Sequence, residues 1–135
     1  MKLCSACLLG IKCRYDGKSN LNKKIIRLLK KEILIPVCPE QLGGLPTPRE
    51  PACVNGKKVV TESGKDVTKN FKRGAEAVLR IAKLYGIKEA IMKQGSPSCG
   101  SKKIYSVSKK LIKGIGITAK LLKKNGIKVI SEEEL

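Results

Sequence analysis

The stretch DVTKNFKRGAEAVLRIAKLYGIKEAIMKQGSPSCG, residues 66–100, is predicted to form a helix, a strand and a cysteine-containing turn in succession. Apolar side chains recur at helical spacing over residues 67–85, Asp66 is a helix-capping residue, and Gly86 is a typical helix stop. The short apolar run over residues 89–93 then predicts a strand, and it leads into the turn of residues 95–100. The pattern therefore places Cys99 just beyond the end of a strand.

The rest of the chain shows the same alternation of strands and helices. We expect further strands at residues 2–6, 33–37 and 128–130, and further helices at residues 21–32, with Leu21, Ile25, Leu28 and Leu29 on one stripe, and at residues 117–124. We also expect a long structured loop at residues 41–55 and one arm of a small hairpin at residues 57–62. Strands separated by helices predict an α/β fold, here a single domain over residues 1–135 with a three-layer, Rossmann-like arrangement and a mostly parallel sheet.

Three cysteines, Cys7, Cys38 and Cys99, each follow one of the predicted strands. Because ligands in parallel sheets bind outside the carboxyl ends of the strands, we expect these three thiols to share one site. The chain has no histidine, which excludes the common mixed Cys/His zinc site. Sulfur ligands without imidazole favour an iron-sulfur cluster or zinc.

The other cysteines have simpler explanations. Cys4 lies three positions before Cys7 on an extended strand, so the two side chains point to opposite faces and Cys4 is expected in the core rather than in a redox pair. Cys13 and Cys53 are interpreted as buried or incidental thiols. We expect neither a signal peptide nor a membrane-spanning segment, which predicts a cytoplasmic protein with reduced thiols.

One acidic residue and several serines accompany the three cysteines. Glu40 follows Cys38 by two positions and is fixed by Pro39, and a carboxylate in that place could act as a general acid or base. Serines surround Cys99 at positions 96, 98 and 101. A serine in such a turn is often only a turn former, although its hydroxyl could also bind a substrate carbonyl.

The strong positive charge admits two interpretations. The chain has 29 Lys and Arg against 11 Asp and Glu, a formal net charge of +18, which would attract phosphate-bearing partners. Most of the excess is lysine at exposed helical positions, and only four aromatic residues exist to stack bases, so dedicated RNA binding is disfavoured. A phosphate-binding P-loop is excluded because six residues separate Gly10 from Gly17, where the pattern has four.

Several motifs together resemble the thiouracil desulfurase family, and the resemblance covers nearly the whole chain. They are SACLLG at residues 5–10, RYDG at 14–17, CPE at 38–40, GGL at 43–45, PR at 48–49, GSPSCG at 95–100 and GITA at 116–119. The resemblance implies a small α/β protein with a 4Fe-4S cluster held by Cys7, Cys38 and Cys99. It also implies one iron not bound by protein, which takes substrate sulfur and can carry an extra sulfide.

The same resemblance assigns catalytic roles and a partner. Glu40 matches the family's acid/base and Ser96 its substrate-orienting hydroxyl. The implied activity is the non-redox removal of sulfur from a thiouracil-like base, so the expected partner is a small thiolated nucleobase or nucleoside. Thiolated tRNA is the substrate of longer family members with an extra domain. Two alternatives stay open: a cluster-based sulfide carrier that acts with tRNA or another acceptor, and a zinc-binding module without catalysis.

Overall fold

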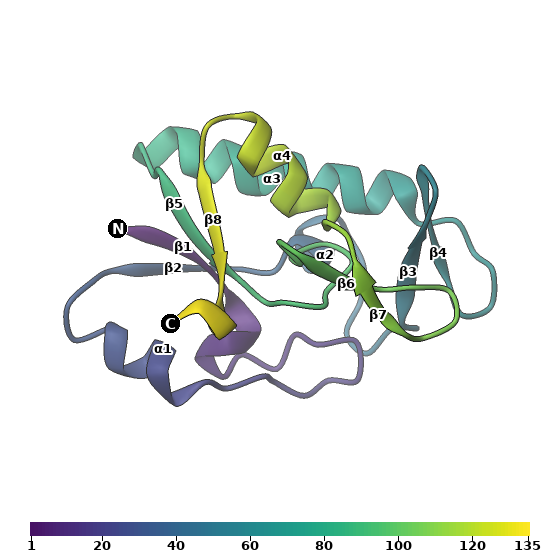
Figure 1. Ribbon diagram of the computed structural model, residues 1–135, viewed down its shortest axis with the longest axis horizontal. Helices are drawn as coiled ribbons and strands as arrows, with labels where there is room; N and C mark the ends of the chain where they lie inside the picture. Colours follow the sequence, from purple (N-terminus) through teal and green to yellow (C-terminus); the bar gives the residue numbers. More distant parts are fainter.

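The computed structural model describes residues 1–135 and has a central parallel sheet of four strands in the order β2-β1-β5-β8 (Figure 1). All three strand pairs of this sheet are parallel, which confirms the predicted α/β class. Its strands are β1 (Lys2–Ser5), β2 (Leu34–Val37), β5 (Glu89–Met92) and β8 (Lys128–Ser131). Two antiparallel hairpins accompany it, β3 (Ala52–Asn55) with β4 (Lys58–Thr61), and β6 (Lys103–Tyr105) with β7 (Leu111–Lys113).

Helices cover both faces of the sheet. The helices α3 (Thr68–Tyr85) and α4 (Ile117–Lys124) pack on one face, and the short η1 (Ala6–Leu9) and α1 (Lys23–Leu28) on the other (Figure 1). The side chains of β5 alternate between the two faces of the sheet: Ala90 and Met92 pack on the α3 side, and Ile91 packs on the α1 side. Cys4 is fully buried on the α1 side, in the core. The chain contains no helix with the length and apolar character needed to span a bilayer.

A close contact between α3 and α2 (Pro39–Leu42) positions the segment that carries Glu40. Gly74 of α3 lies against the backbone of Pro39, where an added Cβ would overlap the Pro39 carbonyl oxygen. Gly43, at the end of α2, lies in the same way against the carbonyl oxygen of Asn70. The two helices can therefore approach backbone to backbone only because both positions lack a side chain.

The predicted helix over residues 21–32 was too long. Asn22 caps α1, because its side chain accepts hydrogen bonds from the amides of Lys24 and Ile25, and the helix ends at Leu28. Of the expected apolar stripe only Ile25 is fully buried, whereas Leu21 and Leu29 are 58% and 44% exposed. The apolar pattern therefore predicted too long a helix, and the capping asparagine marks where the helix begins.

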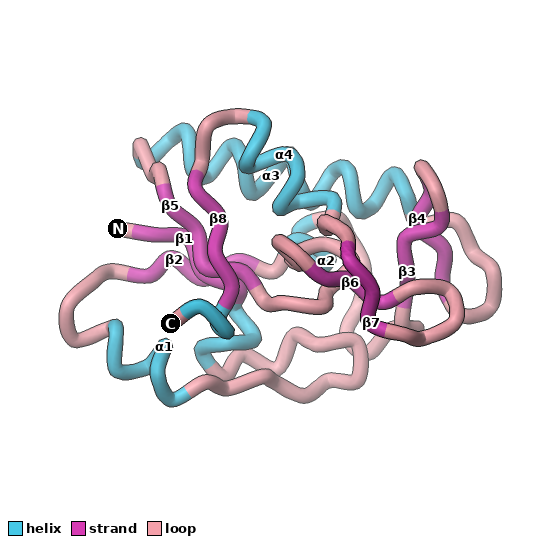
Figure 2. The backbone as a smooth tube through the Cα atoms, in the orientation of Figure 1, coloured by secondary structure: helices cyan, strands magenta, loops and turns pink.

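The hairpins also differ from the expectation. The predicted loop over residues 41–55 begins inside α2 and ends as β3, which pairs with β4, so the predicted arm at 57–62 does form a hairpin. The hairpin of β6 and β7 was not predicted, because residues 102–113 are rich in lysine and the strand β7 is exposed throughout. Figure 2 shows both hairpins beyond the carboxyl ends of β1 and β5.

Candidate functional site

The topology opens a crevice at the carboxyl ends of β1 and β5. The chain leaves β1 toward α1 on one face, and after β5 it reaches α4 on the other face, which is the arrangement that creates ligand sites in parallel sheets. A cavity of about 690 Å³ occupies this place. Cys7 in η1, Cys38 after β2 and Cys99 in the turn after β5 all line it, so the structure brings the three predicted thiols together.

Two of these thiols are readily ionised. A hydrogen bond from the Cys13 thiol lowers the pKa of Cys7 to about 7, with a further contribution from Asn20. The Cys13 thiol also lowers the pKa of Cys38 to about 6, helped by the Gln41 amide. Burial, in contrast, raises the pKa of Cys99. Near neutral pH Cys38 is therefore mostly ionised and Cys7 about half ionised, whereas Cys99 must lose its proton to bind a metal.

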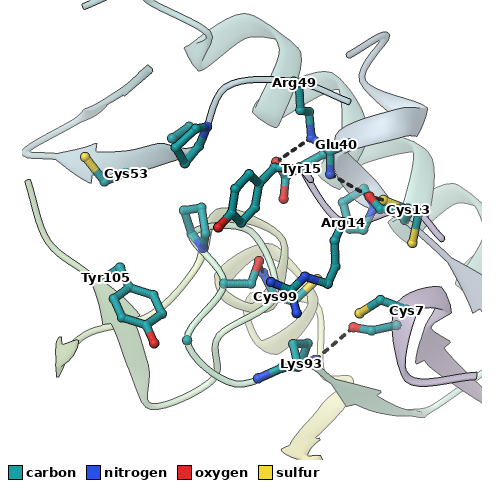
Figure 3. A pocket seen from close by; sticks show the side chains of 18 of the residues that line it. Cys7, Cys13, Arg14, Tyr15, Glu40, Arg49, Cys53, Lys93, Cys99 and Tyr105 are labelled. Carbon is teal, nitrogen blue, oxygen red and sulfur yellow. Dashed lines mark hydrogen bonds and ion pairs between the residues drawn. The ribbon is translucent and has the colours of Figure 1, made fainter. Parts of the chain in front are cut away.

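Glu40 is fixed on the cavity wall by a buried arginine. The Arg49 Nε donates to Glu40 Oε1 at 3.1 Å, and the Arg49 side chain is 6% exposed. Arg49 also donates to the Thr47 hydroxyl at 2.9 Å and to the Cys13 carbonyl oxygen at 2.8 Å. Glu40 Oε2 receives no hydrogen bond from the chain, so it is available to a molecule in the cavity (Figure 3).

Ser96 lines the cavity and organises the turn that carries Cys99. Its hydroxyl oxygen accepts hydrogen bonds from the amides of Ser98 at 3.1 Å and Cys99 at 3.0 Å. Because both amides point at the oxygen, the hydroxyl hydrogen remains free to be donated to a ligand. Ser98 is instead fully buried with its hydroxyl 2.7 Å from that of Thr118, and Ser101 does not line the cavity.

Glu132, in the C-terminal segment, holds the residues that lead from β5 into the turn that carries Cys99. Glu132 Oε1 accepts the Gln94 amide at 2.7 Å, and its Oε2 pairs with Lys93 Nζ at 3.0 Å. The Gln94 side chain then accepts the amides of Lys102 and Lys103. Lys93 and Gln94 line the cavity, but no sequence pattern assigned a role to them or to Arg49. The only signal for Glu132 was an acidic run at the end of a basic chain.

The two cysteines interpreted as buried or incidental both line the cavity, in different parts of it. Cys13 is 2% exposed, and its carbonyl oxygen accepts a hydrogen bond from the Cys38 thiol at 3.8 Å. Cys53 belongs to β3 and lies in the outer part with Tyr105, away from Cys7 and Cys13 (Figure 3). The cavity therefore has an inner, thiol-lined end and an outer end formed by the hairpins.

Comparison with known proteins agrees with this geometry. The sequence model of the family described as 2-thiouracil desulfurase matches residues 3–134. The chain belongs to the 2-thiouracil desulfurase family. It is 46% identical over 147 aligned residues to the uncharacterized protein YbbK of Bacillus subtilis (strain 168), with 100% of this chain and 97% of that protein covered. The resemblance inferred from the motifs is confirmed.

A solved structure shows the same fold. The 4Fe-4S-dependent thiouracil desulfidase TudS superposes with a TM-score of 0.94 at 46% identity, covering 99% of this chain and 91% of TudS. The donor set of our chain suits such a cluster, because three thiols surround one cavity in a protein without histidine. No three Cys, Asp or Glu side chains group closely enough to hold a single metal ion. The three thiols thus line a cavity and do not converge on the position of a single ion.

Proposed function

We propose that this chain is a 4Fe-4S-dependent thiouracil desulfidase in which Cys7, Cys38 and Cys99 hold the cluster and Glu40 and Ser96 act on the substrate. The observation that carries the proposal is the convergence of these five side chains on one cavity. The family membership and the similarity to TudS support it. All six cysteines are free thiols, which supports a reducing setting such as the cytoplasm.

The proposed reaction is a hydrolysis and needs no oxidant. Water replaces sulfur at the ring carbon, so that C=S and H₂O give C=O and H₂S. The carbon-sulfur bond breaks, the oxygen comes from water, and both water protons leave with the sulfide. When bound, the cluster supplies a Lewis-acidic iron for the thiocarbonyl sulfur. The chain must supply the proton transfers and hold the ring in place.

Glu40 is suited to the proton transfers. Its Oε1 is occupied by Arg49, which fixes the carboxylate plane, while Oε2 faces the cavity without a partner. Oε2 can take a proton from the attacking water and return it to the departing sulfur. Since Arg49 also donates to three further acceptors, on Pro46, Thr47 and Cys13, the carboxylate keeps its position through the cycle.

Ser96 is suited to orienting the ring. With its oxygen accepting two backbone amides, its hydrogen is the part left for a substrate carbonyl or ring nitrogen. The Tyr15 side chain also lines the cavity and offers an aromatic face to a flat pyrimidine. The substrate class we propose is therefore a small thiolated nucleobase or nucleoside.

The test is an anaerobic turnover assay on the cluster-reconstituted protein. We expect 2-thiouracil to yield uracil and sulfide in equal amounts with no acceptor added. A carrier would require an acceptor, so a chain that holds the full cluster yet forms uracil only when tRNA or another acceptor is present would overturn the hydrolase. Absence of turnover from a fully loaded protein with or without an acceptor would overturn it as well.

A further inference from the structure

Arg14, the first residue of the RYDG motif, lines the cavity, and the proposed mechanism does not use it. The motif forms a tight loop, in which the Arg14 amide donates to the Lys18 carbonyl oxygen at 3.1 Å. The Tyr15 carbonyl oxygen accepts a hydrogen bond from the Arg49 amide at 2.8 Å, and Arg49 in turn holds Glu40. The loop that carries Arg14 is therefore fixed to the wall of the cavity that carries the proposed acid/base.

Two contacts hold the Arg14 guanidinium in one orientation. Its Nη1 donates to Asn20 Oδ1 at 2.9 Å, and its Nη2 donates to Asp16 Oδ2 at 3.0 Å. Most of its N–H groups have no acceptor in the chain. Figure 3 shows the side chain pointing into the inner end of the cavity, where Cys7 and Cys99 also lie. The guanidinium is thus oriented in advance, with donors left for a ligand.

The three other cationic side chains that line the cavity are differently placed. Arg49 makes four hydrogen bonds to the chain through its guanidinium. Lys93 Nζ pairs with Glu132 at 3.0 Å and also donates to a backbone carbonyl oxygen at 2.7 Å. Lys109 is 76% exposed. Arg14 is therefore the cation at the inner end with the most donors available to a substrate.

We propose that Arg14 binds the carbonyl oxygen of the thiolated pyrimidine and so determines specificity for thiouracil over thiocytosine. The inference rests on the proposed function, which places such a base in this cavity, and it names the part of the ring that the site recognises. In 2-thiocytosine an amino group replaces the carbonyl oxygen of 2-thiouracil. A guanidinium can only donate hydrogen bonds, so it binds the oxygen but finds no acceptor on the amino group.

The chemistry of the site assigns this discrimination to Arg14 rather than to Ser96. A hydrogen bond from a charged donor is stronger than a neutral one, and a site built around it discriminates against an analogue that lacks the acceptor. The Ser96 hydrogen can go to a carbonyl oxygen or to a ring nitrogen, so it finds an acceptor on either base. Loss of the guanidinium should therefore lower the preference between the two bases.

The experiment compares Arg14→Met, Arg14→Lys and the matched control Arg80→Met with the wild type, each reconstituted anaerobically. Arg80 is exposed on α3, so its substitution removes the same charge outside the cavity. Iron per chain is measured first, then kcat/KM for 2-thiouracil and 2-thiocytosine. The dissociation constants of the sulfur-free bases uracil and cytosine are measured by calorimetric titration.

We expect Arg14→Met to keep its iron and to lose about 10–100-fold in the thiouracil-to-thiocytosine ratio of kcat/KM. The uracil-to-cytosine ratio of affinities should fall by a similar factor. Arg14→Lys keeps a cationic donor without the planar fork, so it should recover only part of each ratio. Arg80→Met should match the wild type.

Two results would overturn the inference: unchanged ratios in an Arg14→Met protein with full iron, or a wild type that binds uracil no better than cytosine. Should Arg14→Met fail to fold, ratios in Arg14→Lys equal to those of the wild type would overturn it as well. The affinities do not depend on turnover. A loaded wild type that does not turn over thiouracil would overturn the proposed reaction, while the uracil-to-cytosine ratio would still decide the role of Arg14.

Discussion

Replacing Glu40 by glutamine separates proton transfer from the architecture of the site. The variant Glu40→Gln keeps the shape of the side chain, and the new amide oxygen can still accept the 3.1 Å hydrogen bond from Arg49 Nε. Arg49 also keeps its bonds to Pro46, Thr47 and Cys13. The variant should therefore fold, with a stability loss of about 1–3 kcal/mol from the missing negative charge.

The expected loss of activity is much larger than this loss of stability. A positioned general acid or base contributes about 10²–10⁴-fold to a rate. At about 1.36 kcal/mol for each tenfold change, the activation free energy should rise by about 3–5 kcal/mol. Iron content should stay at the wild-type level, because Glu40 is not one of the proposed cluster ligands.

The assay measures uracil formation and iron per chain for Glu40→Gln beside Glu62→Gln. Glu62 also lines the cavity but is exposed and pairs with Lys109 at 2.9 Å, so its substitution controls for the loss of one negative charge. We expect Glu62→Gln to retain nearly full turnover. Turnover of Glu40→Gln within about threefold of the wild type would refute the proton-transfer role, because it corresponds to less than about 1 kcal/mol.

Three further predictions concern the scaffold and the charge. Gly74→Ala should lower the free energy of unfolding in urea by about 1–3 kcal/mol, because the added methyl group overlaps the Pro39 carbonyl oxygen. Glu76→Ala, at an exposed position of the same helix, should be nearly neutral, and equal stabilities of the two variants would contradict the packing argument. Glu132→Ala should lose cluster iron to a chelator faster than Glu132→Gln, because the glutamine can still accept the hydrogen bond from the Gln94 amide. Equal rates of iron loss would show that this hydrogen bond does not stabilise the site. Turnover of uncharged thiouracil should hardly change with salt while tRNA binding declines steeply, and efficient desulfuration of thiolated tRNA near physiological salt would contradict a small-molecule substrate.

The parts of the fold that were predictable from the sequence are those with strong local signals. The helix α3 has a long apolar stripe and ends at Gly86, which has a positive φ of 63°, and α4 was predicted over the residues it occupies. The hairpin of β6 and β7 lacks such a signal, since every residue of β7 is exposed and no apolar alternation survives. Its strands form because they pair with each other, and the sequence of either strand alone does not predict that pairing.

The site was predictable where it follows from topology. Parallel strands bring their carboxyl ends to one edge, so Cys7, Cys38 and Cys99 could be placed together from strand positions. The supporting contacts were not predictable, because they join segments far apart in the chain. Arg49 reaches back 36 positions to the Cys13 carbonyl, and Glu132 reaches 38 positions to Gln94. Such contacts depend on the finished fold.

The most direct test of the central claim is cluster content and thiouracil turnover measured together on single cysteine variants. Cys7→Ala, Cys38→Ala and Cys99→Ala are prepared anaerobically with Cys53→Ala as the control. The account predicts that the first three lose the cluster and form no uracil, while Cys53→Ala keeps both and releases one sulfide for each uracil. Full iron content and normal turnover in any of the first three would contradict it.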